Sequence, residues 1–192
     1  MPISDIEVDS SVPTTWADEA LGCVVPGELY SSGAVEGWLI TVSAGSASQE
    51  FHSDGTGDLM VTCAEADRVS SLPWINVVNA ASLTGVTSVI ISTAQDDTEV
   101  VRVDDADRID LVLSALSEPT YLDSRSSCDP LFQVKFVTAV GTTSFEYTCS
   151  GKILRGTQSF WNGADGIAPA GFQRIINEAL GARVFPGFPP TP

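Results

Sequence analysis

Apolar and polar residues alternate with a period of two in the first third of the chain, which indicates β-strands. "GWLITVSAG" (37–45) predicts one strand, and "SQEFHSD" (48–54) predicts the strand that returns beside it. On the first strand, one face carries Trp38, Ile40 and Val42. "DLMVTC" (58–63) predicts a further strand, which ends at Cys63 with that cysteine on the apolar side. The glycines of the intervening "DGTG" suit a hairpin turn, because glycine readily takes a positive φ.

The second half repeats this pattern in two further hairpins. "VTSVIISTA" (86–94) and "TEVVRVD" (98–104) predict the first hairpin, joined by the turn "QDD". The stretch 131–149 predicts the second, with Gly141 in its turn. Its apolar positions alternate with Gln133 and Lys135, so one face of the predicted sheet is polar.

Two segments have helical rather than strand periodicity. "DDADRIDLVLSALSEP" (104–119) places apolar residues at helical spacing, with an Asp to cap its start and a Pro to end it. "APAGFQRIINEALG" (168–181) has one apolar stripe, a Pro in its first turn and Gly181 as a natural C-terminal cap. "AEADRVSSL" (64–72) predicts a shorter helical turn before Pro73.

These elements predict an α+β protein built from two small antiparallel-sheet units with packed helices. We place a mostly-β unit at 1–82 and an α+β unit at 83–185. The tail at 186–192 is rich in proline and cannot continue a helix.

The charge of the chain excludes several kinds of partner. It has 192 residues with 25 acids and 9 bases, for a net charge of −16. Nucleic acid and anionic lipid are therefore not expected partners, because phosphate binding needs clustered Lys and Arg. Basic proteins, cations and cationic peptides would be attracted, although acidity can also serve solubility alone. No apolar run approaches the roughly 18–20 residues of a membrane span.

Four cysteines, Cys23, Cys63, Cys128 and Cys149, occur without any CxxC pair, so a zinc ribbon is not expected. They allow three disulfide connectivities. The two-unit organisation favours Cys23–Cys63 and Cys128–Cys149, each tying a loop to the end of a strand. The alternative is four reduced, buried cysteines that act as small apolar side chains.

Disulfides bear on where the protein works. The start of the chain, "MPISDIEVDSS", has neither the basic nor the apolar region of a signal peptide, which by itself predicts a cytoplasmic protein. A chain whose leader has been removed would look the same. Because disulfides form in oxidising compartments, we expect an extracellular, cell-surface or periplasmic location.

The stretch "WADEALGCVVPGELY" (16–30) suits neither a regular helix nor a regular strand. We expect an irregular lobe that Trp16 and Leu21 anchor to the core and that Cys23 ties to the strand ending at Cys63. Together with "GWLITV" and "EFHSDGTG", its pattern W-x-D-x-x-LGC-x-x-PG-x-x-Y resembles a module of uncharacterised exported bacterial proteins and lipoproteins. The matching positions are Trp16, Asp18, Leu21, Gly22, Cys23, Pro26, Gly27, Tyr30, Gly37, Phe51, His52, Asp54 and Cys63.

That resemblance covers about residues 3–63 and implies export, but it carries no activity, because the families have none assigned. The second half more loosely resembles lipoprotein domains with a helix, a cysteine, a hairpin and a second cysteine. Neither resemblance implies a cofactor, and we expect none.

Few residues are candidates for chemistry. His52 is the one histidine, and no G-x-S-x-G elbow accompanies it, so its expected role is to bond the lobe. Trp161 and Asn162, in the glycine-flanked loop "SFWNGADG" (159–166), are candidate contacts for a protein or carbohydrate partner, together with His52. The alternative for Trp161 is that it covers the core beneath the last helix.

Acidic clusters offer oxygen ligands but lack a complete calcium motif. The loop "DGTGD" (54–58) could supply part of a calcium site, whereas Asp96 with Asp97 is most simply a turn and the acids at 104–107 are most simply a helix N-terminus. We therefore predict no metal site. No pair of acids stands out as the two carboxylates of a glycosidase.

These observations predict an exported, non-catalytic binding or accessory protein, inhibitor-like or adhesion-like. The alternative is a secreted hydrolase that uses acidic residues or His52. The pattern leaves the ligand and the oligomeric state open.

Overall fold

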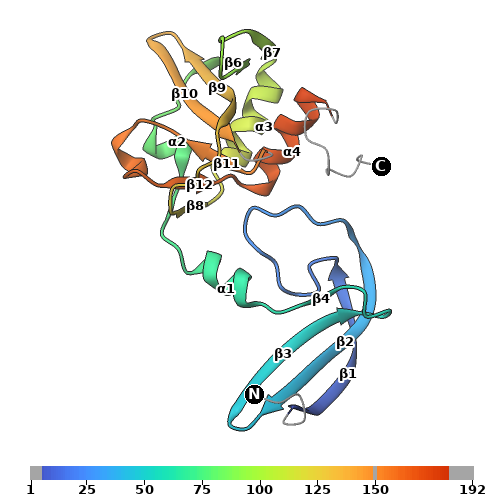
Figure 1. Cartoon of the computed structure of the whole chain (residues 1–192). Coiled ribbons are helices and arrows are strands. Elements are labelled where there is room, and N and C mark those ends of the chain that lie inside the picture. The colour runs from blue at the N-terminus through green and yellow to red at the C-terminus, as the bar shows by residue number, and fades with distance from the viewer. Residues whose placement is uncertain (1–5, 149–150, 182–192) are drawn as a thin grey trace. The chain divides into compact units, whose positions relative to one another are not determined.

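The computed structural model describes residues 6–148 and 151–181. The chain divides into two compact units, Met1–Ser71 (unit 1) and Leu72–Pro192 (unit 2). Each combines antiparallel strands with helices, which confirms the predicted α+β class (Figure 1). The stretch 72–82, expected in the first unit, groups with the second because it supplies a strand and a buried valine to unit 2.

Unit 1 is one four-stranded antiparallel sheet and a short helix. The strands are ordered β1-β2-β3-β4. Their bounds are β1 Ile6–Asp18, β2 Ser32–Ala44, β3 Ala47–Asp54 and β4 Met60–Val61, followed by helix α1, Ala64–Ser70. The predicted hairpin and the helical turn before Pro73 are therefore confirmed, while β4 is shorter than predicted and ends before Cys63.

Residues 19–31 form an irregular lobe of unit 1, and its packing depends on glycines. The lobe was expected to begin at Trp16, but the structure places residues 16–18 in β1, which pairs with β2. Leu21 is fully buried, as predicted, and Trp16 is buried at the end of β1. A Cβ on Gly37 would lie 1.9 Å from the carbonyl oxygen of Ser53, so no other residue fits that point of β2. Gly22, at φ +80°, lies against the Trp16 ring, which explains the small residue beside Cys23.

The disulfide Cys23–Cys63 closes the lobe onto the sheet, and this predicted pairing is confirmed. The bond joins residues 40 positions apart. The second predicted pairing involves Cys149, which lies outside the described residues.

Unit 2 is an eight-stranded antiparallel sheet ordered β5-β8-β12-β11-β10-β9-β6-β7. Its long strands are β6 Val86–Thr93, β7 Glu99–Val103, β9 Pro130–Thr138 and β10 Gly141–Thr148. Its short strands are β5 Trp74–Ile75, β8 Thr120–Asp123, β11 Ile153–Arg155 and β12 Asp165–Ile167. The helices are α2 Val77–Ala80, α3 Ala106–Leu116 and α4 Ala170–Leu180, with a 3-10 turn, η3, at Ser159–Trp161.

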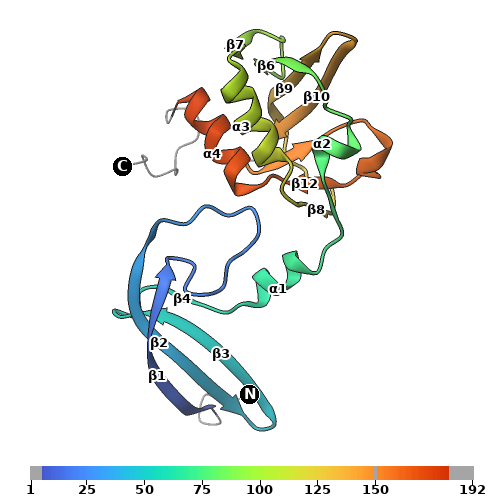
Figure 2. The ribbon, with the colours of Figure 1, turned by 180° about the vertical axis from the view of Figure 1, so that it is seen from behind.

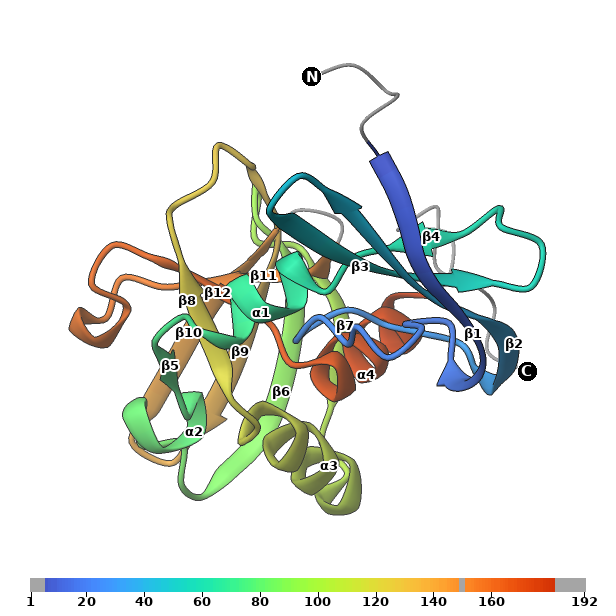
Figure 3. The same ribbon diagram turned by 90° about the horizontal axis from the view of Figure 1, so that it is seen from below.

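One face of this sheet carries the core of unit 2. α3 and α4 lie side by side over it in all three ribbon views (Figures 1, 2 and 3). Their apolar stripes form one buried cluster with the inward residues of β6, β9 and β10. The cluster includes Ile109, Val112, Leu116, Phe172, Ile176, Val134, Phe136 and Phe145. The apolar faces that the sequence periodicity predicted for the helices and for the strands therefore pack against each other.

The helix ends of unit 2 follow the predicted capping residues. The Asp105 side chain accepts a hydrogen bond from the Arg108 amide at the start of α3. Pro169 precedes the first residue of α4, and Gly181 caps the end of α4 at φ +78°. None of the helices in the described ranges is long and apolar enough to span a membrane.

Removing the Cys23–Cys63 bond should destabilise unit 1. In the chain-entropy model, a loop of this size corresponds to about 3–4 kcal/mol of stability. We expect C23A/C63A to lose hydrogen-exchange protection over β2 and β3. The strands β9 and β10 are the internal control and should keep theirs, because their core lies within unit 2. Unchanged protection of β2 and β3 in the variant would show that the lobe is held without the bond.

Candidate functional site

The helix-free face of the unit 2 sheet is polar, and its side chains are in register across three strands. Gln133 of β9 pairs with Glu146 of β10, which pairs with Arg155 of β11. Because directly opposed residues of antiparallel strands share a face, these side chains lie on the side opposite Phe132 and Tyr147. The alternation at 131–136 predicted this polar face.

A pocket of about 710 Å³ opens over this face. The loop that follows β11 forms one of its walls. The described residues that line it are Arg125, Gln133, Ser144, Glu146, Arg155, Gly156, Thr157, Gln158, Ser159, Asn162 and Gly163. The lining is thus made of hydroxyl, amide and charged side chains with two glycines.

The floor of the pocket rests on a buried ion pair. Arg155 donates through Nε and Nη2 to the two carboxylate oxygens of Asp165, at 2.7 and 2.8 Å. Their side chains are only 7% and 1% exposed. The Arg155 guanidinium also donates to the carbonyl oxygens of Ser126 and Cys128, which fixes the preceding loop. Such a bidentate pair is geometrically strict, so it orients β11, β12 and that loop together.

This pair also sets the charge state of the floor. Burial opposes ionisation of Asp165, but hydrogen bonds from Arg155 and Ser126 outweigh it, so the pKa of Asp165 lies below its ordinary value of 3.8. The same partner, Asp165, raises the pKa of Arg155 despite burial. Asp165 therefore stays ionised at neutral pH and cannot serve as a general acid.

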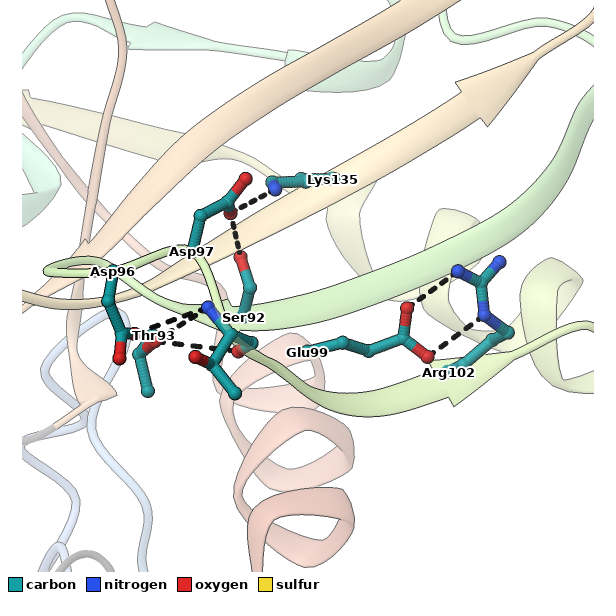
Figure 4. Close-up of polar contacts among 8 residues, drawn as sticks. Ser92, Thr93, Asp96, Asp97, Glu99, Arg102 and Lys135 are labelled. Atoms are coloured by element: carbon teal, nitrogen blue, oxygen red, sulfur yellow. Dashed lines mark hydrogen bonds and ion pairs between the residues drawn. The ribbon is translucent and has the colours of Figure 1, made fainter.

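The other cations on this face are also held by acids, as Figure 4 shows. Lys135 of β9 donates to Asp97, which also accepts from Ser92. Arg102 of β7 makes a two-point contact with Glu99, at 2.6 and 3.0 Å. The hydrogen bonds from Lys135 and Arg102 lower the pKa of Asp97 and Glu99 respectively.

Arg125 is the exception. It lies in the loop between β8 and β9, is exposed and lines the pocket. No hydrogen bond or ion pair engages its guanidinium within the described ranges, whereas Lys135, Arg102 and Arg155 are each matched to a carboxylate. Arg125 can therefore meet an anionic group of a ligand without breaking an existing contact.

Of the predicted contact residues, Asn162 lines this pocket and Trp161 does not. Trp161 is 1% exposed and belongs to the core of unit 2. Its indole is therefore part of the core, as in the alternative interpretation, and is not an exposed contact. Its Nε1 donates to Oε1 of Gln158, at 3.0 Å. A Cβ on Gly156 or Gly166 would lie within 2.5 Å of the indole, so both glycines are needed to seat it. Trp161 thus positions the loop that carries Gln158 and Asn162.

His52 is in unit 1 and bonds the lobe, as expected. Its Nδ1 donates to the carbonyl oxygen of Leu21, and its Nε2 lies 3.0 Å from Oε1 of Glu50. The ring stacks on Trp16, with centroids 4.6 Å apart. Both ring nitrogens are engaged and the ring is buried, so His52 is arranged as a structural clamp.

Cys23, His52 and Cys63 come close enough for three metal ligands, but both sulfurs are in the disulfide and cannot act as thiolates. The acidic clusters form turns instead. Asp54 accepts hydrogen bonds from Thr56 and from the amides of Gly57 and Leu59. In the β6–β7 turn, Thr93 donates to Asp96, which lowers the pKa of Asp96.

Most residues of the pocket were not predicted from the sequence. The "SFWNGADG" segment supplies Ser159, Asn162 and Gly163, but Arg125 and Arg155 were not singled out. The signal available in the sequence was the polar alternation of 131–136 beside a glycine-rich loop. Nothing local indicates that Arg155 pairs with Asp165, ten residues later and on another strand.

Comparison with known proteins finds a family model that matches part of the chain. Residues 1–63 match the model of a domain of unknown function (DUF8738), about a third of the chain. The match covers the part in which the LGC–PG–Y module resemblance was found. No curated protein and no solved structure matches the chain.

His52→Ala should lower the free energy of unfolding of unit 1 by about 2–4 kcal/mol, because it removes a buried ring and leaves a carbonyl unpaired. Urea denaturation followed by NMR signals of unit 1 measures this. Glu50→Gln is the matched control, because Glu50 is exposed and the amide oxygen of Gln can still lie near Nε2 of His52. This variant should change the free energy of unfolding by less than about 0.5 kcal/mol. An alanine variant as stable as the wild type would show that the clamp is dispensable.

Asp165→Asn should destabilise unit 2 by about 3–5 kcal/mol at pH 7, because it leaves the buried Arg155 uncompensated. Since the folded pKa of Asp165 is lowered, its stabilisation is complete above the ordinary value of 3.8 and is lost as pH falls through the folded value. The difference between variant and wild type should therefore shrink in acid. Asp110→Asn, an exposed helical acid, is the control and should be nearly neutral. A difference independent of pH would contradict this account.

Proposed function

We propose that the chain is an exported, non-catalytic binding or accessory protein whose ligand occupies the pocket of unit 2. The observation that carries the proposal is Arg125, a cation without a partner among the described residues, at a pocket whose other cation is already neutralised. Around it stand hydroxyl and amide groups that can donate and accept hydrogen bonds.

The lining favours a particular ligand chemistry. A carboxylate would meet Arg125, while neutral polar groups would meet Gln133, Gln158 and Asn162. Among the described lining residues none is aromatic, so the stacking platform common in sugar binding is missing. A peptidic ligand with a carboxylate therefore fits the pocket better than a neutral carbohydrate.

The pocket supports binding over hydrolysis. Among its described lining residues, Glu146 is the one acid, and Asp165 beneath it is tied to Arg155 and kept ionised. Glu146 and Asp165 both lie against Arg155, but the pKa of Asp165 is lowered rather than raised. Acid–base hydrolysis of glycosides needs one carboxylic acid that stays protonated, and Asp165 does not supply it. His52 is occupied by Leu21 and Glu50, so it does not support the alternative either.

Export is supported by the Cys23–Cys63 disulfide, which persists in oxidising compartments. The form of the site supports an adhesion-like or accessory role over an inhibitor-like one. An inhibitor inserts a rigid segment into another protein, whereas a pocket receives a ligand group.

The test is an NMR titration of the amides of Gly156, Thr157 and Gly163 with N-acetyl-dialanine and with its C-terminal amide. Glucuronate and glucose form a second pair, in which the first ligand carries a carboxylate and the second is neutral. We expect the free peptide acid to shift these signals and its amide to bind about 10–100-fold more weakly, the range of one charge-assisted hydrogen bond.

Arg125→Gln should remove this preference for the acid. Arg174→Gln is the matched control, because Arg174 is an exposed arginine on α4, on the helical side of the sheet. Equal binding of acid and amide, no shift with either acid, or acid binding unchanged in Arg125→Gln would each contradict the proposal. A preference for glucuronate over the peptide acid would reassign the ligand to acidic sugars and overturn the peptidic assignment.

A further inference from the structure

The sheet of unit 1 has an apolar face that the lobe leaves uncovered. Residues paired across neighbouring strands lie on the same side of the sheet. On this side Val8 pairs with Val42, and Ile40 pairs with Phe51. Ser53 pairs with both Trp38 and Met60, which places these two on the same side. This side also carries Ser11, Gln49 and Ser53. We use the name apolar face for its apolar residues, which are Ile6, Val8, Trp38, Ile40, Val42, Phe51 and Met60.

The lobe of unit 1 packs against the opposite side. That side carries Trp16 and His52, and the contact runs through the hydrogen bond from His52 to Leu21. The apolar face stays open to solvent at its ends, with Ile6 50%, Val8 66%, Trp38 40% and Met60 52% exposed.

This arrangement departs from the usual pattern of an antiparallel sheet that has one face in solvent, because apolar residues occupy both faces. Antiparallel sheets normally turn their apolar side to the core and their polar side to water. In β2 the side away from the lobe carries Trp38, Ile40 and Val42, of which Trp38 is 40% exposed, while Leu39, Thr41 and Ser43 lie on the lobe side. Large contiguous apolar patches on a protein surface mark interaction sites.

The charge of unit 1 identifies what can cover this face. Residues 1–71 contain six Asp and six Glu against one base, Arg68, a net charge of −11. Arg68 is engaged by Glu65. Two copies of unit 1 would repel each other, and so would an anionic membrane. A cation-rich partner is attracted instead.

We propose that the apolar face is the docking surface for a cationic, amphipathic segment of a partner protein. Apolar side chains of that segment would cover Ile40, Val42 and Phe51, while its Lys and Arg would be attracted by the net negative charge of unit 1. This surface lies in unit 1 and is separate from the pocket of unit 2, so the two proposals stand or fall independently.

The probe is a Leu–Lys amphipathic peptide about 15 residues long, the length at which an isolated helix becomes stable. Its counterpart carries Glu in place of every Lys. Titrated into the full chain by calorimetry, the Lys peptide should bind, and its affinity should fall as salt is raised. The Glu peptide should not bind.

The variants separate apolar docking from general charge attraction. V8T/V42T keeps β-branched residues in β1 and β2 but removes methyl groups from the apolar face, and should weaken binding by at least about fivefold. V100T is the matched control, since Val100 is a 47% exposed strand residue of unit 2, and should bind as the wild type does.

A second readout does not depend on these variants folding. In the wild type, the indole NMR signal of Trp38 should shift on binding, while that of Trp74, 58% exposed in unit 2, should not. Equal binding of the Glu peptide, equal affinity of V8T/V42T and V100T, or an unmoved Trp38 signal would each overturn the proposal. So would a concentration-dependent dimer that V8T/V42T abolishes, because the occupant would then be a second copy of the chain.

Discussion

The pocket of unit 2 depends on one buried ion pair. Arg155 meets both carboxylate oxygens of Asp165, and its remaining hydrogens reach the carbonyl oxygens of Ser126 and Cys128. Two short strands of three residues each would hold their places weakly by backbone hydrogen bonds alone. The side-chain pair joins them to each other and to the loop that carries Arg125. The ion pair therefore fixes the shape of the pocket floor and neutralises the charge of Arg155. Because Arg155 is neutralised, Arg125 is the cation available to a ligand.

Unit 1 solves a similar problem with different chemistry. Its lobe has no periodic pattern to bury, so single contacts hold it: the Cys23–Cys63 bond, the His52 hydrogen bond to Leu21 and the Trp16 ring stacked on His52. These contacts converge on one side of the sheet. On the other side, Ile6, Val8, Trp38 and Met60 remain 40% or more exposed. A sheet whose stability comes from one clamped face can expose apolar residues on its other face, because those residues are not needed for its own core.

Most long helices and strands could be predicted from the sequence. The irregular lobe of unit 1 could be predicted only in part, through the Cys23–Cys63 pairing. The β2–β3 hairpin, the β9–β10 hairpin, α3 and α4 follow from periodicity and capping, because those signals lie within a few adjacent residues. The Cys23–Cys63 pairing followed from the two-unit organisation. The long strand β1 was not predicted from periodicity, because Pro13 and the irregularity between Val8 and Ser10 interrupt its alternation. The short strands β5, β8, β11 and β12 were missed, because two to four residues carry no period and their pairing is set by distant partners. Trp161 illustrates the same limit: its loop looked exposed, yet two glycines at positions 156 and 166 open the space in which it is buried.

The distribution of charge links the two proposed surfaces. The bases concentrate in unit 2, where Lys135, Arg102 and Arg155 are matched to acids on the helix-free face and Arg125 is the exception at the pocket. Unit 1 has a single base and twelve acids. A net charge of −16 would otherwise suggest one uniform preference for cations. The structure instead separates a polar pocket with one available cation, Arg125, from an acidic unit with an apolar face. Binding at the pocket should depend on a single charge contact, whereas binding at the apolar face should combine burial with long-range attraction, which salt weakens only in part.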